Sequence, residues 1–229
     1  MRMIFVRHGD PDYEHDCLTP TGRQQAAAAA KRLSREGITT IYSSPNGRAM
    51  ETAAFTADLL GLEIRRLDYM HEISWGGEGI PFKGHPWTLG DMMISQEDYD
   101  FFAGDWRRHP WFDGNTAVDY YDMIARQIDG LTLAHGYRHD GNRYLCEFGR
   151  DETIALFSHG GSGACALSHI LKLPFPYMCT VMTFDFTSVT ILDFPVRPGQ
   201  YIHPRLALFN DAAHLSSGEQ GPKIQQISE

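Results

Sequence analysis

The 229-residue chain lacks a long apolar run, an excess of basic residues and any Cys-x-x-Cys pair. A membrane-spanning helix requires about 18 consecutive apolar residues, so we expect no membrane span. The 20 Lys and Arg residues are outnumbered by 29 Asp and Glu residues, and the formal net charge is −9. Nucleic acids and anionic membranes attract basic surfaces, so we expect neither as a partner. The negative net charge does not exclude a small anionic ligand, because a few convergent arginines create a local positive site.

Neither a secretory signal nor a disulfide framework is indicated. The first apolar segment, 3–6, is shorter than the apolar core of a signal peptide. The cysteines are widely spaced, which is typical of free thiols in a reducing compartment; they are Cys17, Cys146, Cys165 and Cys179. We therefore expect a cytoplasmic protein. No internal repeat is present, and hydrophobic residues make up 42% of the chain, enough to form a buried core.

The first third of the chain alternates between strand-like and helix-like segments. Thr19 and Pro20 are a typical N-cap and first residue of a helix, and the alanine-rich segment that follows them ends before Gly37. The predicted elements are strand 3–6, helix 20–35, strand 38–42, helix 45–60 and strand 62–67. This alternation predicts a parallel α/β sheet.

The alternation stops near residue 76. The segment 76–115 is rich in Gly, Trp, Asp and His and has little periodicity, so we interpret it as loops with one short helix. Further along we expect a helix over 116–135, a polar connector over 136–151 with a short strand at 144–148, a strand over 153–157, a helix over 161–171, and strands over 186–194 and 205–209. The sequence predicts a single domain over 1–215, with an insertion at about 76–150 and a flexible tail over 216–229.

Two histidines follow predicted strands. His8 lies in Arg7-His8-Gly9, and His159 lies in Ser158-His159-Gly160-Gly161. In an open α/β sheet, ligands bind outside the carboxyl ends of the strands. A neutral imidazole can attack phosphorus, an arginine offers a planar fork to phosphate oxygens, and glycines that open a helix leave N–H groups to face an anion. Taken alone, each string also fits an ordinary turn.

An arginine and a glutamate follow two other predicted strands. Arg48 lies in the first turn of the helix after Ser43-Ser44-Pro45, where free N–H groups favour an anion. Glu72 lies next to Ile73 and near Trp75, and desolvation by such neighbours favours the protonated carboxyl group that a general acid requires. Taken alone, Arg48 also fits a solvated helix residue, and Glu72 a surface loop.

Together these segments resemble the histidine phosphatase superfamily, also called the phosphoglycerate mutase-like family. The resemblance is carried by Arg7-His8-Gly9, Leu18-Thr19-Pro20-Thr21-Gly22, Ser43-Ser44-Pro45, Arg48-Ala49, Glu51-Thr52-Ala53, the Glu72 loop and Ser158-His159-Gly160. It implies a three-layer α/β/α sandwich with a mostly parallel central sheet and an inserted subregion.

The resemblance also implies a role for each matching residue. His8 would be the nucleophile that forms a phosphohistidine, and Glu72 would protonate the leaving group and then assist the attacking water. Arg7, Arg48 and His159, with the backbone at Gly160, would hold the phosphoryl group. Neither a metal nor another cofactor is implied, since the arginines and histidines supply the positive charge.

The expected activity is therefore metal-independent hydrolysis of a small phosphomonoester through a phosphohistidine on His8. The segment after Gly9 reads Asp10-Pro11-Asp12-Tyr13 and departs from the longer signature of the glycolytic mutases, which favours the phosphatase. One alternative is a mutase of the phosphoglycerate mutase type, which returns the phosphoryl group to a second hydroxyl. The other is a non-catalytic member that binds phosphorylated ligands. The sequence indicates neither the particular substrate nor the oligomeric state.

Three further groups of residues have competing interpretations. The segment 135–140 contains two histidines, and we interpret it as a polar loop rather than a metal site, since it has no His-Glu-x-x-His pattern. The acidic residues of the helix over 116–135 are interpreted as a solvated face; they are Asp119, Asp122 and Asp129. Side chains of the insertion either shape a lid over the substrate or belong to the core; they are Lys83, Trp87, Trp106, Arg107, Arg108 and Trp111.

Overall fold

The computed structural model describes residues 1–215, and the predicted tail, 216–229, lies outside the described residues. Its centre is a six-stranded sheet with the strand order β11-β9-β1-β8-β4-β5. The strands of this sheet are β1 (Arg2–Arg7), β4 (Ile38–Ser43), β5 (Ile64–Arg66), β8 (Thr153–Ser158), β9 (Val189–Asp193) and β11 (Arg205–Asp211). The α-helices of the described residues are α1 (Pro20–Leu33), α2 (Gly47–Leu60), α3 (Pro86–Glu97), α4 (Thr116–Ala134), α5 (Gly160–Leu171) and α6 (Phe175–Val181).

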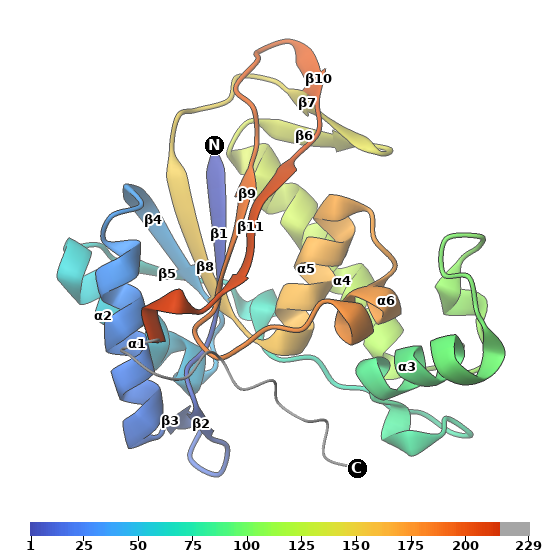
Figure 1. The fold of residues 1–229 in the computed structure, drawn as a ribbon. Coiled ribbons are helices and arrows are strands. Elements are labelled where there is room, and N and C mark those ends of the chain that lie inside the picture. Colours follow the sequence, from blue (N-terminus) through green and yellow to red (C-terminus); the bar gives the residue numbers. More distant parts are fainter. Residues whose placement is uncertain (216–229) are drawn as a thin grey trace.

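The central strand β1 is buried on both faces of the sheet. Alternate side chains of a strand point to opposite faces, so Met3 and Phe5 join one buried cluster while Ile4 and Val6 join another. A continuous apolar run of this kind is typical of a strand covered by helices on both sides. Helices α1 and α2 cover one face and α4, α5 and α6 cover the other (Figure 1). The predicted three-layer α/β/α architecture is confirmed.

The sheet is mostly parallel, as predicted. β1 pairs in parallel with β8, β8 with β4, and β4 with β5. On the other side of β1, β9 pairs antiparallel with β1, and β11 pairs antiparallel with β9. In the central pairing, Arg7 lies opposite Ser158. The residues that directly follow these two strands, His8 and His159, are therefore neighbours at one edge of the sheet.

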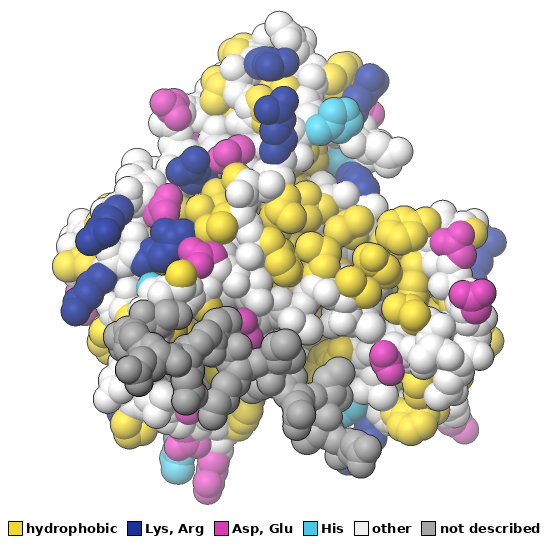
Figure 2. Space-filling view, viewed as in Figure 1, with side chains coloured by type: hydrophobic (Ala, Val, Ile, Leu, Met, Phe, Trp, Pro, Cys, Tyr) yellow, Lys and Arg dark blue, Asp and Glu magenta, His cyan; other side chains and the backbone are white. Residues whose placement is uncertain are grey.

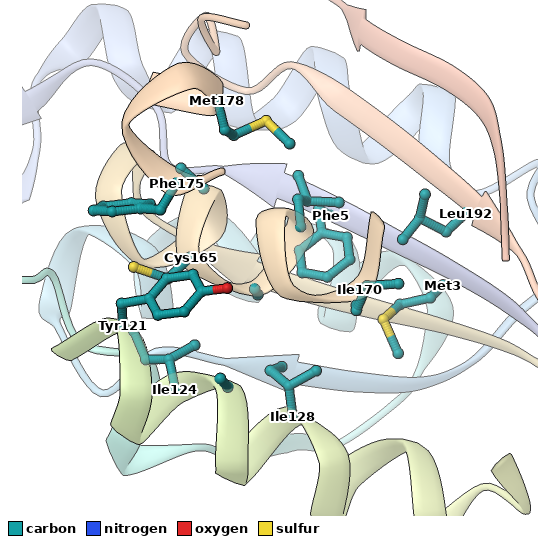
Figure 3. Close-up of a cluster of buried hydrophobic side chains, with 14 of the residues drawn as sticks. Met3, Phe5, Tyr121, Ile124, Ile128, Cys165, Ile170, Phe175, Met178 and Leu192 are labelled. Carbon is teal, nitrogen blue, oxygen red and sulfur yellow. The ribbon is translucent and has the colours of Figure 1, made fainter. Parts of the chain in front are cut away.

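The larger buried cluster lies between the sheet and α4, α5 and α6. Figure 3 shows Met3 and Phe5 of β1 facing Ile124 and Ile128 of α4, with side chains of α5 and α6 closing the space around them. This packing holds α5 against the sheet, and the first turn of α5 follows His159 directly.

Local signals place the ends of the first two helices. The Thr19 hydroxyl accepts a hydrogen bond from the Gly22 N–H, as predicted for an N-cap, and Gly61 ends α2 in a left-handed conformation with φ 65°. The expected start of α2 at Ser44 and Pro45 was wrong, because the helix begins at Gly47 with Asn46 as N-cap. The Ser44 hydroxyl is occupied elsewhere, by a hydrogen bond with His159.

The segment 76–150 contains more regular structure than we expected. The short helix is confirmed as α3, and the helix over 116–135 as α4. The short strand expected at 144–148 is present as β7 (Arg143–Cys146), but the residues before it are not a loop. They form β6 (Tyr137–Asp140), which pairs with β7 in a hairpin, and β10 (Gln200–Ile202) is added as a third strand. The prediction missed β6 and β10 because these strands are short and partly polar. It also missed α6, whose seven residues follow Pro174.

The structure decides between the alternatives for two groups of side chains in this segment. Trp106 belongs to the core: it is buried against Phe112, and the Arg107 guanidinium lies over its ring. Of the acidic residues on α4, only Asp119 is exposed. Asp122 accepts hydrogen bonds from Arg107 at 3.0 and 3.2 Å, and Asp129 contacts two histidines. The expectation of a solvated face therefore holds for Asp119, whereas Asp122 and Asp129 are partly covered and bonded to neighbouring side chains.

On part of the surface, basic and acidic side chains lie next to one another. Figure 2 shows Lys and Arg side chains beside acidic ones on the side of the molecule that carries α1 and α2, where Arg2 and Arg32 both pair with Glu36. All four cysteines are free thiols, as expected. Among the residues that the structure describes, no helix is long and apolar enough to cross a membrane.

The core between α4 and the sheet can be tested by truncating one side chain. Replacing Ile128, which is fully buried, with alanine leaves a cavity, and we expect Ile128→Ala to lower the free energy of unfolding by about 2–5 kcal/mol. Ile94→Ala is the matched control, because the side chain of Ile94 is 39% exposed. Urea denaturation measures both variants, and equal effects would contradict this description of the core.

Candidate active site

His8 and His159 meet where β1 and β8 end. Their ring centroids are 5.1 Å apart, and both side chains are buried. The His8 N–H donates to the Ser158 carbonyl at 3.0 Å, so the ladder between the two strands continues to the histidine itself. Backbone pairing, rather than side-chain contact alone, fixes the distance between the two rings.

The surroundings of His8 determine its tautomer. Nδ1 lies 2.7 Å from the Gly9 carbonyl oxygen, which can only accept, so Nδ1 carries the proton and Nε2 keeps its lone pair. The Arg48 Nε–H group donates to Nε2 at 3.3 Å. Burial, together with the charges of Arg7 and Arg48, lowers the pKa of His8 to about 3. His8 is therefore neutral at pH 7, with an unprotonated nitrogen facing a cationic side chain.

His159 is neutral for the same reasons. Burial lowers the pKa of His159 to about 2, and the neighbouring His8 and Arg48 contribute. Its Nε2 lies 2.7 Å from the Ser44 hydroxyl oxygen, while its buried Nδ1 has no hydrogen-bond partner among the described residues. When Ser44 donates to Nε2, the proton of His159 lies on Nδ1, which is then a free donor.

The arginine that precedes His8 also has an unused donor. One terminal nitrogen of Arg7 donates to the Phe184 carbonyl oxygen, and the guanidinium lies 4.3 Å from the centre of the Phe186 ring. Its buried Nε has no hydrogen-bond partner in the described part of the chain. An unpaired buried N–H group costs free energy, so Arg7 Nε and His159 Nδ1 favour a ligand that accepts hydrogen bonds. The Gly160 Cα lies near this guanidinium: a Cβ there would be 3.8 Å from its central carbon.

Asp16 balances the charge of Arg48, and sequence reasoning missed it. Its carboxylate accepts from the Arg48 guanidinium and from the Gly47 N–H at 2.7 Å. The residue adopts a left-handed backbone conformation with φ 48°, which is unfavourable for most residues other than glycine. Burial opposes ionisation, but these hydrogen bonds lower the pKa of Asp16. No pattern in the polar loop distinguishes Asp16 from its acidic neighbours.

Glu72 reaches the same site from the loop after β5. Its carboxylate accepts from the backbone N–H of Ser162 at 3.0 Å and of Gly161 at 3.4 Å. A Cβ on Gly161 would lie 2.7 Å from a Glu72 oxygen, so the close approach requires glycine. Burial raises the pKa of Glu72, although these backbone hydrogen bonds and the charge of Arg7 oppose the rise. The group retains its proton to higher pH than an ordinary carboxyl group does.

The structure thus brings together all the candidate residues: Arg7, His8, Arg48, Glu72, His159 and Gly160. It differs from expectation in how two helix ends are used. The N–H groups of Gly161 and Ser162, which we expected to face phosphate, are occupied by Glu72, and that of Gly47 is occupied by Asp16. Side-chain donors of Arg7, Arg48 and His159 remain, so the site is suited to a small tetrahedral anion placed between two arginines and two neutral histidines.

The chain belongs to the histidine phosphatase superfamily. The family model described as "Histidine phosphatase superfamily (branch 1)" matches residues 3–201. Two phosphoserine phosphatases of Hydrogenobacter thermophilus, one of them named as putative, are 32% and 27% identical, and the chain spans about half of their length (46% and 54%). A probable phosphoglycerate mutase GpmB of an Enterobacter strain is 26% identical over 95% of this chain and 96% of the relative.

A solved structure of a mycobacterial relative has the same fold. It is a glucosyl-3-phosphoglycerate phosphatase in complex with inorganic phosphate, and it is 25% identical to this chain. The match covers 94% of this chain and 99% of the relative, with a TM-score of 0.63. The family resemblance drawn from the motifs is therefore confirmed.

The protonation state of His8 can be measured directly. A free imidazole titrates near pH 6.5, but we expect the ring signals of His8 in NMR spectra to stay those of a neutral imidazole between about pH 5 and pH 8, because burial lowers its pKa to about 3. The Nδ1 proton should be the one detected. A titration midpoint near the ordinary value would contradict the buried, neutral histidine described above.

Proposed function

We propose that this protein is a phosphatase that hydrolyses a small phosphomonoester through a phosphohistidine on His8, without a catalytic metal. The observation that carries the proposal is the state of His8: a neutral ring whose Nδ1 proton is held by the Gly9 carbonyl and whose Nε2 lone pair faces Arg48. The phosphatases among the relatives support the same reaction class.

In the first step, the His8 Nε2 lone pair attacks phosphorus and the bond from phosphorus to the ester oxygen breaks. The leaving oxygen takes its proton from the Glu72 carboxyl group, whose raised pKa suits a general acid. The Arg7 Nε–H group and the His159 Nδ1–H group, unpaired in the described residues, donate to the phosphoryl oxygens. Arg48, which already contacts His8, neutralises charge on the same group.

In the second step, water attacks the phosphoryl group and the bond to Nε2 breaks, with its electron pair returning to the ring. The Glu72 carboxylate takes the proton of the water, which restores the acid for the next cycle. Throughout, the Gly9 carbonyl keeps the proton on Nδ1 and so stabilises the positive charge of the phosphorylated ring. Phosphate is the product, and no atom or proton is left over.

The nucleophile can be tested with a substrate that reports phosphate release. We expect His8→Ala to abolish hydrolysis of p-nitrophenyl phosphate, because no other unprotonated nitrogen occupies its position. His203→Ala is the matched control, since His203 is exposed on the connection after β10; it should retain wild-type turnover. Unchanged turnover in the His8 variant would refute the mechanism, and assaying phosphate and p-nitrophenol together confirms that both products form.

A mutase is the second candidate, and the relative named as a probable phosphoglycerate mutase is the observation that favours it. The two activities differ in the acceptor of the phosphoryl group. A panel of phosphomonoesters assayed both for free phosphate and for positional isomers separates them. We expect free phosphate in stoichiometric amounts; isomer formation without phosphate release would instead establish the mutase.

The role of Glu72 predicts a dependence on the leaving group. We expect Glu72→Gln to lower kcat by about 10²- to 10⁴-fold for an alkyl phosphate, as is typical of a lost general acid. The loss should be smaller for p-nitrophenyl phosphate, whose leaving group needs no proton. Wild-type activity falls as the pH rises through the pKa of Glu72, and the variant should lack this decline. Glu63→Gln is the control at an exposed glutamate, and equal losses for both substrates would contradict an acid role.

A further inference from the structure

A second cluster of titratable side chains lies outside the site described above. Asp129 of α4, His139 of β6 and His169 of α5 place one potential ligand atom each within 4.8 Å of one another. One carboxylate oxygen of Asp129 lies 2.7 Å from His169 Nε2, and the other lies 3.0 Å from His139 Nδ1. The two imidazole rings are 4.9 Å apart. Side chains of three elements, α4, β6 and α5, therefore meet at one carboxylate.

The cluster is separate from the candidate active site. His169 is in the last turn of α5, nine residues after Gly160, which corresponds to about 14 Å along a helix axis. α4 packs on both α5 and β6 (Figure 1). The three side chains thus join the helical layer to the small sheet formed by β6, β7 and β10, and all three are anchored on regular elements.

The donor set is that of a borderline divalent cation. Zn²⁺ takes imidazole nitrogen and carboxylate oxygen at about 2.0–2.2 Å, and a tetrahedral ion therefore separates its ligand atoms by about 3.3 Å. The observed separations of 2.7 and 3.0 Å are those of direct hydrogen bonds. To accommodate the ion, each imidazole would move slightly away from the Asp129 carboxylate, and the two rings would move closer to each other. The nitrogen that faces the carboxylate, Nδ1 of His139 or Nε2 of His169, would carry no proton. A water molecule would take the fourth position.

A neighbouring buried hydroxyl group supports the presence of a ligand. Tyr144 is fully buried, and its hydroxyl has no hydrogen-bond partner among residues 1–215. Its ring lies 5.1 Å from that of His139. Burial raises the pKa of Tyr144, and the charge of the Asp129 carboxylate raises it further. A water molecule on a bound ion would give this hydroxyl a partner.

The charge of Asp129 favours a bound cation, whereas the charge of Lys172 opposes it. Burial opposes ionisation of Asp129, but the hydrogen bonds from His169 and His139 lower its pKa, so the carboxylate is charged at neutral pH. The Lys172 ammonium contacts His139 Nε2, which also lies 2.7 Å from the Gly141 carbonyl oxygen. A positive charge beside one ligand weakens cation binding, and burial lowers the pKa of Lys172.

We propose that Asp129, His139 and His169 form a site for a divalent transition-metal ion of the Zn²⁺ class, which links α4, α5 and β6 and plays no part in catalysis. This proposal is independent of the phosphatase mechanism. It also differs from our interpretation of the segment 135–140 from sequence, because only His139 of that segment takes part. His135 bonds instead to Tyr42 and Glu152.

The test uses the full chain, stripped of metal with a chelator and titrated with Zn²⁺ by calorimetry and with Co²⁺ by visible absorption. We expect one ion per wild-type chain, a four-coordinate Co²⁺ spectrum and a Zn²⁺-dependent rise in Tm. His169→Asn should weaken binding by at least about 100-fold, since even the loss of an outer-shell partner costs 10- to 100-fold. His203→Asn, at an exposed histidine, is the matched control and should bind normally.

Two further variants keep the proposal falsifiable if His169→Asn fails to fold. Lys172→Gln removes the opposing charge and leaves all three ligands, so it should bind Zn²⁺ more tightly than the wild type. His8→Asn should leave the Co²⁺ spectrum unchanged. The proposal is overturned if the wild type does not bind Zn²⁺, if His169→Asn binds as well as the wild type, or if binding is lost in His8→Asn, which would assign the ion to the catalytic histidines.

Discussion

The parallel pairing of β1 with β8 is the constraint on which the candidate site depends. With Arg7 opposite Ser158, the next residue of each strand is a histidine, and the His8 N–H continues the ladder to the Ser158 carbonyl. A shift by one residue would turn His8 to the other face of the sheet, together with the core residues before it. The buried apolar side chains of β1 therefore fix its register with β8, and this register places the rings of His8 and His159 next to each other.

The candidate site contains positively charged side chains, although the chain as a whole is negatively charged. The net charge is −9, yet the buried Arg48 and the partly buried Arg7 accompany two histidines whose pKa values are lowered mainly by burial. The carboxylates are placed at the margins: Asp16 lies on the guanidinium of Arg48, and Glu72 lies on the first turn of α5. The centre of the site therefore has hydrogen-bond donors from Arg7, Arg48 and His159 around the neutral Nε2 of His8. This arrangement suits an anion and keeps the His8 ring unprotonated on Nε2 at neutral pH.

Strong local patterns in the sequence predicted the strands of the central sheet and the helices α1, α2, α4 and α5, and they selected the six candidate residues that the fold brings together. Apolar runs marked β1 and β8, while Thr19 and Gly61 marked helix ends. What sequence reasoning missed depends on contacts between distant segments. Asp16 is one of several acidic residues in a polar loop, and only its contact with Arg48 distinguishes it. Asp129 lies on a polar helical face, and its contacts with His139 of β6 and His169 of α5 appear only in the folded chain. Within the small sheet, β6 and β10 are too short and polar to show periodicity, and only the strand near β7 was expected.

The most direct test of the mechanism is to locate the phosphoryl group on the enzyme. The full chain is mixed with phosphorus-labelled aryl phosphate and quenched in alkali within milliseconds, because the nitrogen–phosphorus bond of phosphohistidine is labile to acid. Peptide mass spectrometry then identifies the labelled residue. The account predicts label on His8 at Nε2, which reaches a steady level while phosphate is released. Phosphate release without label on the enzyme, or label on His159 instead, would contradict it.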